Sequence, residues 1–190
     1  MTVGEILDRT RDLYCRLFAE KLEKLAQESP GDVYSEAALR DASGRAVGDG
    51  PLDLPVRADM ILLSSGQSIS VDSDRILSFS PLSFTWEEQL SVRLGPFHWD
   101  SVVVRLRCAS PPASWAPLSD WYRRWYKEAE DSDGKSLLGV VHFLSDPELS
   151  NGWASFTADL GSAPVEAFEE LLDAIHAVGV REAHVGRSSE

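Results

Sequence analysis

From Trp99 onward, the spacing of the apolar residues switches between that of a strand and that of a helix. The order of these segments restricts the fold more than any other feature of the sequence. Apolar residues three and four apart mark two helices, one that opens at Asp120 and one with Pro164 in its first turn. Strand-like runs surround them at residues 99–108, 137–144, 153–160 and 180–185. This order predicts that residues 97–190 form a ferredoxin-like βαββαβ half, an antiparallel sheet with two helices on one face.

The first 96 residues are predicted to form a long helix followed by antiparallel strands. Thr2 and Glu5 have the spacing of a capping box, and apolar residues recur at helical spacing until residues 29–31, Ser-Pro-Gly, end the pattern. Strand candidates follow at residues 33–40, 56–63, 75–80 and 84–94. We therefore expect an α+β protein, either divided into residues 1–96 and 97–190 or folded as one continuous domain.

Acidic residues outnumber basic residues, and most of the excess lies in the last third of the chain. The sequence holds 18 Lys and Arg against 31 Asp and Glu, for a formal net charge of −13. Residues 1–127 account for −3 of this charge and residues 128–190 for −10. Nucleic-acid binders and proteins that bind anionic membranes need a positive field, so the charge argues against both functions.

The acidic region predicts a non-enzymatic interaction protein that binds a basic protein partner, as an immunity or antitoxin-like protein does. Opposite charges on two partners accelerate their association. The competing interpretation is an acidic surface that keeps the protein in solution. The candidate contacts are six carboxylates, on one loop and on the helix that follows the next strand: Asp146, Glu148, Glu166, Glu169, Glu170 and Asp173.

A second candidate site lies just before the strand at residues 99–108. His98 and Asp100 are two residues apart and would share one face of a strand, beside the aromatic side chain of Trp99. The alternative functions are therefore a small-molecule-binding regulatory module, with its ligand near Trp99, Trp115 and Trp153, or a hydrolase-type enzyme using His98 and Asp100. A hydrogen-bonded structural histidine is the competing interpretation. The sequence lacks a Gly-x-Ser-x-Gly motif, and no catalytic residue is assigned.

Two further groups of residues are interpreted as structural. His142 and His184 lie in separate predicted strands and could share a metal only if those strands were neighbours, so we expect no metal and no cofactor. Aromatic and basic residues alternate from Trp121 to Lys127. Their helical spacing places Trp121 and Trp125 on one face, which favours core packing over nucleic-acid binding.

The ends and the cysteines of the chain predict a cytoplasmic protein. The first residues are charged from Glu5 onward and contain no apolar segment of the kind found in secretory signals. Every apolar run is shorter than the roughly 18 residues that a membrane-spanning helix needs. Cys15 and Cys108 are far apart and lack Cys-x-x-Cys spacing, which indicates two reduced thiols.

Overall fold

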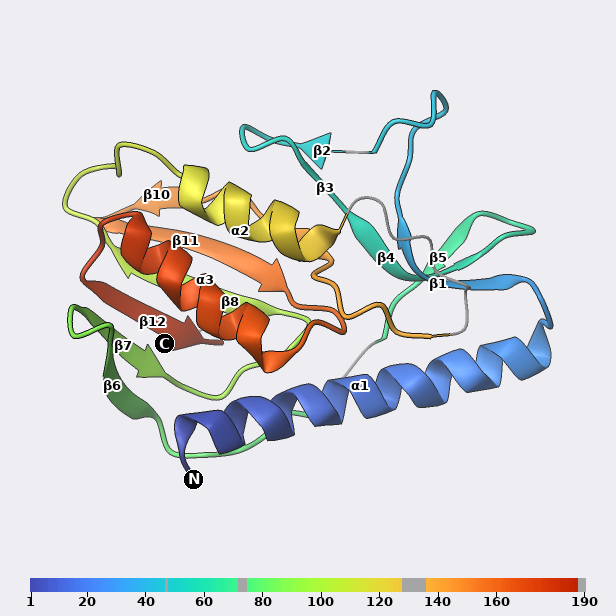
Figure 1. The fold of residues 1–190 in the computed structure, drawn as a ribbon, viewed down its shortest axis with the longest axis horizontal. Helices are drawn as coiled ribbons and strands as arrows, with labels where there is room; N and C mark the ends of the chain where they lie inside the picture. The colour runs from blue at the N-terminus through green and yellow to red at the C-terminus, as the bar shows by residue number, and fades with distance from the viewer. Residues whose placement is uncertain (47, 72–74, 128–135, 188–190) are drawn as a thin grey trace.

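The structure is a computed structural model that describes residues 1–46, 48–71, 75–127 and 136–187 (Figure 1). Within these ranges the chain forms α1 (Val3–Glu28), β1 (Val33–Ala38), β2 (Gly48–Asp49), β3 (Leu54–Pro55), β4 (Arg57–Leu62), β5 (Gln67–Ile69), β6 (Leu82–Trp86), β7 (Leu90–Leu94), β8 (Val102–Arg107), α2 (Ala116–Tyr126), β9 (Phe143–Leu144), β10 (Glu148–Ser150), β11 (Trp153–Asp159), α3 (Val165–Ala177) and β12 (Glu182–Gly186). The predicted α+β class with an N-terminal helix is confirmed. No helix in the described part of the chain is long and apolar enough to cross a lipid bilayer.

The capping box predicted at the start of the chain is present. The hydroxyl of Thr2 accepts a hydrogen bond from the Glu5 N–H at 3.2 Å, and the Glu5 carboxylate accepts one from the Thr2 N–H at 2.7 Å. Two of the four unpaired N–H groups at the helix start are thereby satisfied. The helix then continues to Glu28, and it runs along one side of the molecule (Figure 1).

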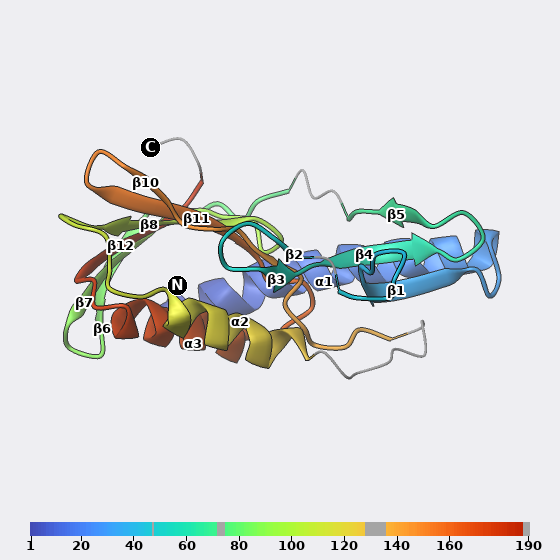
Figure 2. The same cartoon turned by 90° about the horizontal axis from the view of Figure 1, so that it is seen from above.

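The largest sheet has seven strands and positions the candidate site. Its strand order is β10-β11-β8-β12-β7-β6, with β9 also paired to β11. All neighbouring strands are antiparallel except β12 and β7, which are parallel. Strands β6 and β7 come from residues 1–96 and the others from residues 97–190, so both predicted halves contribute to this sheet. The helices α2 and α3 lie together on one face, and the other face carries neither of them (Figure 2).

The main core lies between this sheet and the two helices. Alternate residues of β8 and β11 are buried, as the predicted two-residue period requires. Trp121 is buried and donates its indole N–H to the carbonyl oxygen of Ala167 at 2.8 Å, which links α2 to α3. The ring of Phe168 stacks on those of Phe97 and Trp99. The interpretation of Trp121 as a core residue is confirmed.

Two smaller sheets complete the fold. Strands β1, β4 and β5 form an antiparallel sheet in that order, and β2 pairs with β3. Arg57 connects the small sheet to the end of α2, because its guanidinium donates to the carbonyl oxygens of Glu36, Tyr126 and Lys127. The backbone N–H of Arg57 donates to the carbonyl oxygen of His142 at 3.0 Å. The sheet is therefore anchored to the segment that precedes β9.

Several predicted boundaries are wrong, and local backbone chemistry explains the differences at residues 84–94 and at the start of α2. Residues 75–80 form no strand. Residues 84–94 form a hairpin rather than one strand, because Glu87 and Glu88 adopt positive φ angles of 47° and 58° between β6 and β7. The helix predicted to open at Asp120 begins at Ala116, since a proline is tolerated in the first turn.

The strand predicted over residues 137–144 is reduced to β9 because its backbone groups bond elsewhere. The N–H of Leu138 donates to the carboxylate of Glu36, and the N–H of Val141 donates to the carbonyl oxygen of Trp125. The N–H of His142 donates to the carbonyl oxygen of Asp159. These hydrogen bonds fix the position of His142.

Candidate functional site

The face of the seven-stranded sheet opposite α2 and α3 carries a row of basic side chains. The strand register places Arg93 on β7 directly opposite His184 on β12, and His184 directly opposite Arg105 on β8. Neighbouring strands lie about 4.8 Å apart, so three groups that can hold positive charge meet side by side. Guanidinium groups donate to phosphate and carboxylate oxygens, so such a row favours the binding of an anion.

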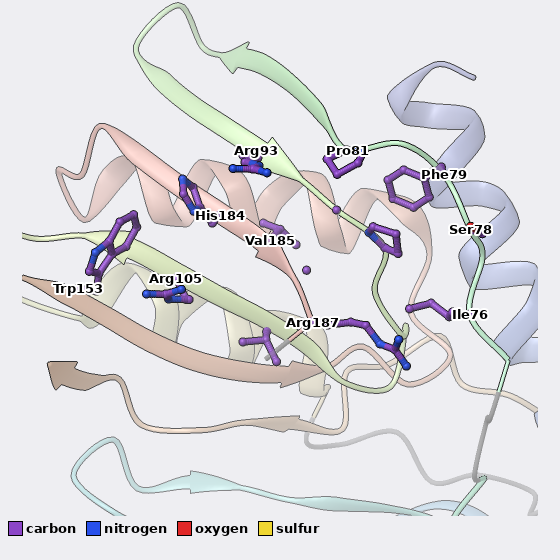
Figure 3. Close-up of a pocket in the computed structure, with 14 residues that line it drawn as sticks. Ile76, Ser78, Phe79, Pro81, Arg93, Arg105, Trp153, His184, Val185 and Arg187 are labelled. Atoms are coloured by element: carbon purple, nitrogen blue, oxygen red, sulfur yellow. The ribbon is translucent and has the colours of Figure 1, made fainter. Parts of the chain in front are cut away.

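A cavity of about 680 Å³ lies over this row (Figure 3). One wall comes from the irregular segment before β6 and is mostly apolar, with Ile76, Phe79 and Pro81. The floor and opposite wall come from the sheet and the residue after β12, with Arg93, Arg105, Trp153, His184 and Arg187. The volume falls within the roughly 300–1,000 Å³ of typical small-molecule sites. The lining suits a ligand with an apolar body and an anionic group.

Trp153 forms one end of the cavity and orders the basic side chains around it. The guanidinium carbons of Arg105 and Arg107 lie 5.0 and 5.1 Å from the centre of its ring. The ring of His184 lies 4.9 Å from the same ring, centre to centre. Cation–π contacts of this kind stabilise guanidinium groups by about 0.5–1 kcal/mol at exposed positions. These contacts therefore favour the observed positions of the two guanidinium groups before a ligand binds.

The charge balance within the cavity remains positive. His184 is close to the carboxylate of Glu182, with 3.1 Å between Nε2 and Oε1, and both side chains are partly exposed. Within the described residues, neither Arg93 nor Arg187 forms an ion pair with a carboxylate. A basic cavity in a chain of net charge −13 was not predicted from composition, which averages over all surfaces. The alternation of Arg105 and Arg107 with buried residues of β8 was the available signal.

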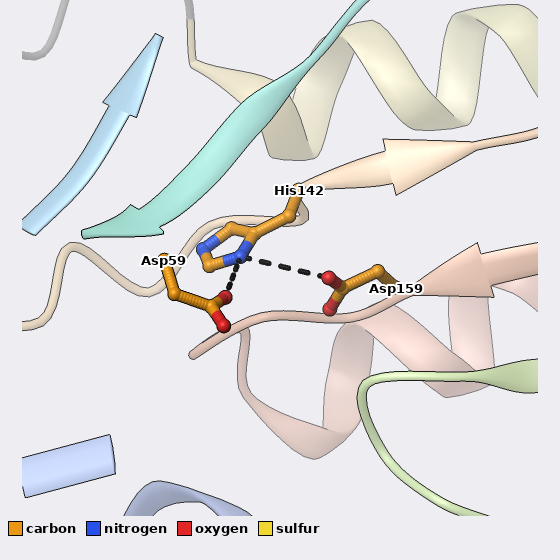
Figure 4. A group of neighbouring side chains, drawn as sticks. All are labelled: Asp59, His142 and Asp159. Carbon is orange, nitrogen blue, oxygen red and sulfur yellow. Dashed lines mark hydrogen bonds and ion pairs between the residues drawn. The ribbon is translucent and has the colours of Figure 1, made fainter. Parts of the chain in front are cut away.

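A second group of polar side chains surrounds His142, which is fully buried (Figure 4). Its Nδ1 lies 2.9 Å from Oδ1 of Asp59 and 3.8 Å from Oδ2 of Asp159. Its Nε2 lies 2.8 Å from Oε1 of Glu36. We call Glu36, Asp59, His142 and Asp159 the buried histidine centre. It unites β1, β4, the end of β11 and the segment before β9.

Each carboxylate of this centre is also held by groups from other segments. Asp59 accepts hydrogen bonds from the Tyr14 hydroxyl at 3.0 Å and from the Val71 N–H at 2.6 Å. Glu36 accepts from the N–H of Leu138 and, at 3.3 Å, from that of Ser162. Asp159 accepts from the N–H of Gly161 at 2.8 Å. The imidazole therefore meets carboxylates whose positions are fixed.

The surroundings shift the pKa values of these groups strongly. Burial acts to lower the pKa of His142, but the charge of Asp159 and the hydrogen bonds to Asp59 and Glu36 outweigh it and raise this pKa to about 10. Burial acts to raise the pKa values of Glu36 and Asp59, but their bonds to His142 lower them overall. Burial raises the pKa of Asp159 to about 7, against the charge of His142. At neutral pH, His142 is therefore an imidazolium between two carboxylates.

None of the residues predicted around His98 lines the cavity, and only Asp100 approaches the buried histidine centre, where burial raises the pKa of Asp159 and the charge of Asp100 adds to this effect. His98 forms an isolated β-bridge with Ser101 in the turn before β8. Trp99 is buried in the core, 1% exposed. Asp100 is half-buried in the same turn. His142 and His184 are not neighbours either: His142 is buried, whereas His184 lies on the open face of the sheet.

The six predicted acidic contacts differ in their surroundings. Three of them already accept hydrogen bonds: Asp146 from the Leu52 N–H, Glu170 from Arg124 and Trp125, and Asp173 from the Trp86 indole. The side chains of the other three form no hydrogen bond or ion pair with described residues: Glu148, Glu166 and Glu169. The acidic residues at 128, 130, 131, 133 and 190, which contribute to the predicted excess, lie outside the described residues.

Searches of protein-family models, of curated proteins and of solved structures return no match to this chain. Its function is therefore argued from the chemistry of its own residues.

Proposed function

We propose that this protein is a binding module for a small anionic ligand, with one phosphate or carboxylate group on an apolar or aromatic body. The observation that supports this function is the row Arg93, His184 and Arg105 at the floor of a 680 Å³ cavity. The sequence predicted a small-molecule-binding module near Trp99, Trp115 and Trp153. Of these three tryptophans, Trp153 lines the cavity. The ligand lies on the open face of the sheet.

The chemistry of the cavity indicates how such a ligand binds. Guanidinium groups donate pairs of parallel hydrogen bonds to phosphate or carboxylate oxygens, and such charge-assisted bonds are shorter and stronger than neutral ones. Arg93 and Arg105 flank His184 and converge on one anionic group. Phe79 and Pro81 provide an apolar wall for the rest of the ligand. A long polyanion is disfavoured because the chain as a whole carries a charge of −13.

Replacing Arg93 with alanine should weaken binding of a phenyl phosphate probe about 10-fold to 100-fold. Hydrogen bonds to charged groups contribute about 1.5–3 kcal/mol, and each 1.4 kcal/mol corresponds to a factor of ten. Binding is measured by quenching of tryptophan fluorescence and by the shift in melting temperature. The matched control is Arg16→Ala, which removes the same charge from an exposed position of α1. Equal affinities of both variants, or no binding of the probe to the wild-type protein, would contradict the proposal.

Docking of a basic protein partner remains a prediction. Only Glu148, Glu166 and Glu169 among its six proposed contacts lack a side-chain bond to another described residue. A cytoplasmic location is likewise proposed, and the free thiols of Cys15 and Cys108 support it.

We also propose a ferredoxin-like arrangement for residues 97–190. The strand order β12-β8-β11-β10 and the antiparallel pairing of those strands support it, as does the placement of α2 and α3 on one face. Two features depart from a simple βαββαβ unit. The strand expected at residues 137–144 is reduced to β9, and β10 forms within residues 145–152, which were predicted to be a loop. Strands β7 and β6 extend the sheet beyond β12.

A further inference from the structure

Three ligand atoms of the buried histidine centre lie close enough to bind one metal ion. Asp59, His142 and Asp159 each offer one such atom, and all three atoms lie within 4.8 Å of one another. No other group of three His, Cys, Asp or Glu residues in the described part of the chain has this property. We propose that these three residues bind a divalent transition-metal ion, Zn²⁺ or Mn²⁺, through Nδ1 of His142 and one oxygen of each aspartate.

The distances fit a single ion. Ligand atoms that bind one ion at about 2.1 Å are at most about 4.2 Å apart, and about 3.0 Å apart at a right angle. The Nδ1 atom of His142 is 2.9 Å from the Asp59 oxygen and 3.8 Å from the Asp159 oxygen, so both pairs satisfy this limit. The two aspartate oxygens lie within 4.8 Å of each other, so a shift of one carboxylate by up to about 0.6 Å brings them within the limit. The ion replaces the proton on Nδ1, which is released to solvent.

Glu36 occupies the position that orients a metal-binding histidine. Histidines that bind a metal through one ring nitrogen usually donate the other ring N–H to a carboxylate, which fixes the ring and its tautomer. Here Nε2 of His142 faces Oε1 of Glu36 at 2.8 Å, and Glu36 is itself held by the N–H groups of Leu138 and Ser162. Nδ1 is thereby directed at Asp59 and Asp159 (Figure 4).

The charge of the centre also favours a cation. Its three carboxylates face a single imidazole, and within the described residues their ion pairs are made only with His142. Even with a protonated imidazole, the ionised Glu36 and Asp59 leave an excess of one negative charge, and ionisation of Asp159 adds a second, which is costly in a buried position. A divalent ion offsets this excess. A mixed nitrogen and oxygen donor set suits Zn²⁺ and Mn²⁺ better than Mg²⁺ or Ca²⁺, which prefer oxygen alone.

Asp159 gives the ion a route from solvent. Its side chain is 23% exposed, whereas those of His142 and Glu36 are fully buried and that of Asp59 is 9% exposed. An ion can therefore meet the Asp159 carboxylate first and then reach Nδ1. The site differs from the cavity on the open face of the sheet in every residue.

The proposal is tested on full-length protein that has been treated with EDTA and dialysed. Titration with ZnCl₂ or MnCl₂ in a calorimeter should show one ion per chain, and MgCl₂ at the same concentration should bind at least about 10-fold more weakly. Asp159→Asn keeps an oxygen that can accept from the Gly161 N–H but removes a charged ligand, so it should weaken Zn²⁺ binding more than about 100-fold. Glu36→Gln should weaken it about 10-fold to 100-fold.

Two controls and one spectrum make the test decisive. Glu169→Gln and His176→Gln, both on α3, should leave the affinity for Zn²⁺ unchanged, which separates the site from surface binding. Co²⁺ in place of Zn²⁺ should give the visible absorption of a nitrogen and oxygen ligand field in wild-type protein, and this readout needs no variant to fold. Absence of one-to-one binding, or equal affinity in Asp159→Asn, would show that a proton rather than a metal balances the centre.

Discussion

Replacing His142 with phenylalanine should lower the free energy of unfolding by about 3–5 kcal/mol. The new side chain is apolar and somewhat larger than histidine, so it leaves no empty space, and the loss comes mainly from the carboxylates. Glu36 and Asp59 lose the imidazolium that faces both of them at 2.8 and 2.9 Å. Removing one partner of a buried ion pair leaves the other charge without compensation, and measured costs are of this size.

Urea unfolding followed by tryptophan fluorescence measures this loss, with EDTA present so that any bound metal does not contribute. The matched control is His184→Phe, which makes the same replacement at a half-buried position on the open face. It should change the free energy of unfolding by less than about 0.5 kcal/mol. A change below about 1 kcal/mol in His142→Phe would show that the buried histidine centre does not stabilise the fold.

Local sequence patterns were enough to predict much of the fold. The capping box at Thr2, the alternation in β8 and β11 and the apolar stripe of α3 each depend on neighbouring residues, and the structure has all of them. The patterns failed where the backbone bonds to distant segments. Leu138 and Val141 lie in an apolar run that predicts a strand, yet their N–H groups donate to Glu36 and to Trp125.

Neither site could be predicted from the sequence, for two different physical reasons. The basic row depends on register, because Arg93, Arg105 and His184 meet only when β12 lies between β7 and β8. The buried histidine centre depends on contacts between residues up to 106 positions apart, such as His142 with Glu36. The net charge of −13 predicts acidic residues on the surface. It could not show that three acidic residues meet a histidine in the interior.

Gly161 supports the same centre, and replacing it with alanine should lower the free energy of unfolding by about 2–5 kcal/mol. Its φ angle is +50°, a conformation that costs an L-residue roughly 1–2 kcal/mol. A Cβ atom there would lie 2.4 Å from Cδ2 of His142 and 2.6 Å from the carbonyl oxygen of Val140. Neither neighbour can move freely, because the ring is bonded at both nitrogens. Overpacking of this kind adds about 1–3 kcal/mol.

A second glycine separates the two causes. Gly66→Ala places a Cβ at a φ angle of +68°, in the same left-handed region, but no atom lies within 4 Å of it. This variant should therefore lose only the conformational part, about 1–2 kcal/mol. The excess loss in Gly161→Ala, measured by urea unfolding under the same conditions, is the cost of displacing His142 and the Val140 carbonyl. Equal losses in the two variants would mean that the imidazole can shift without cost. In that case the bond between Nε2 and Glu36 would be too weak to orient His142 toward a metal ion.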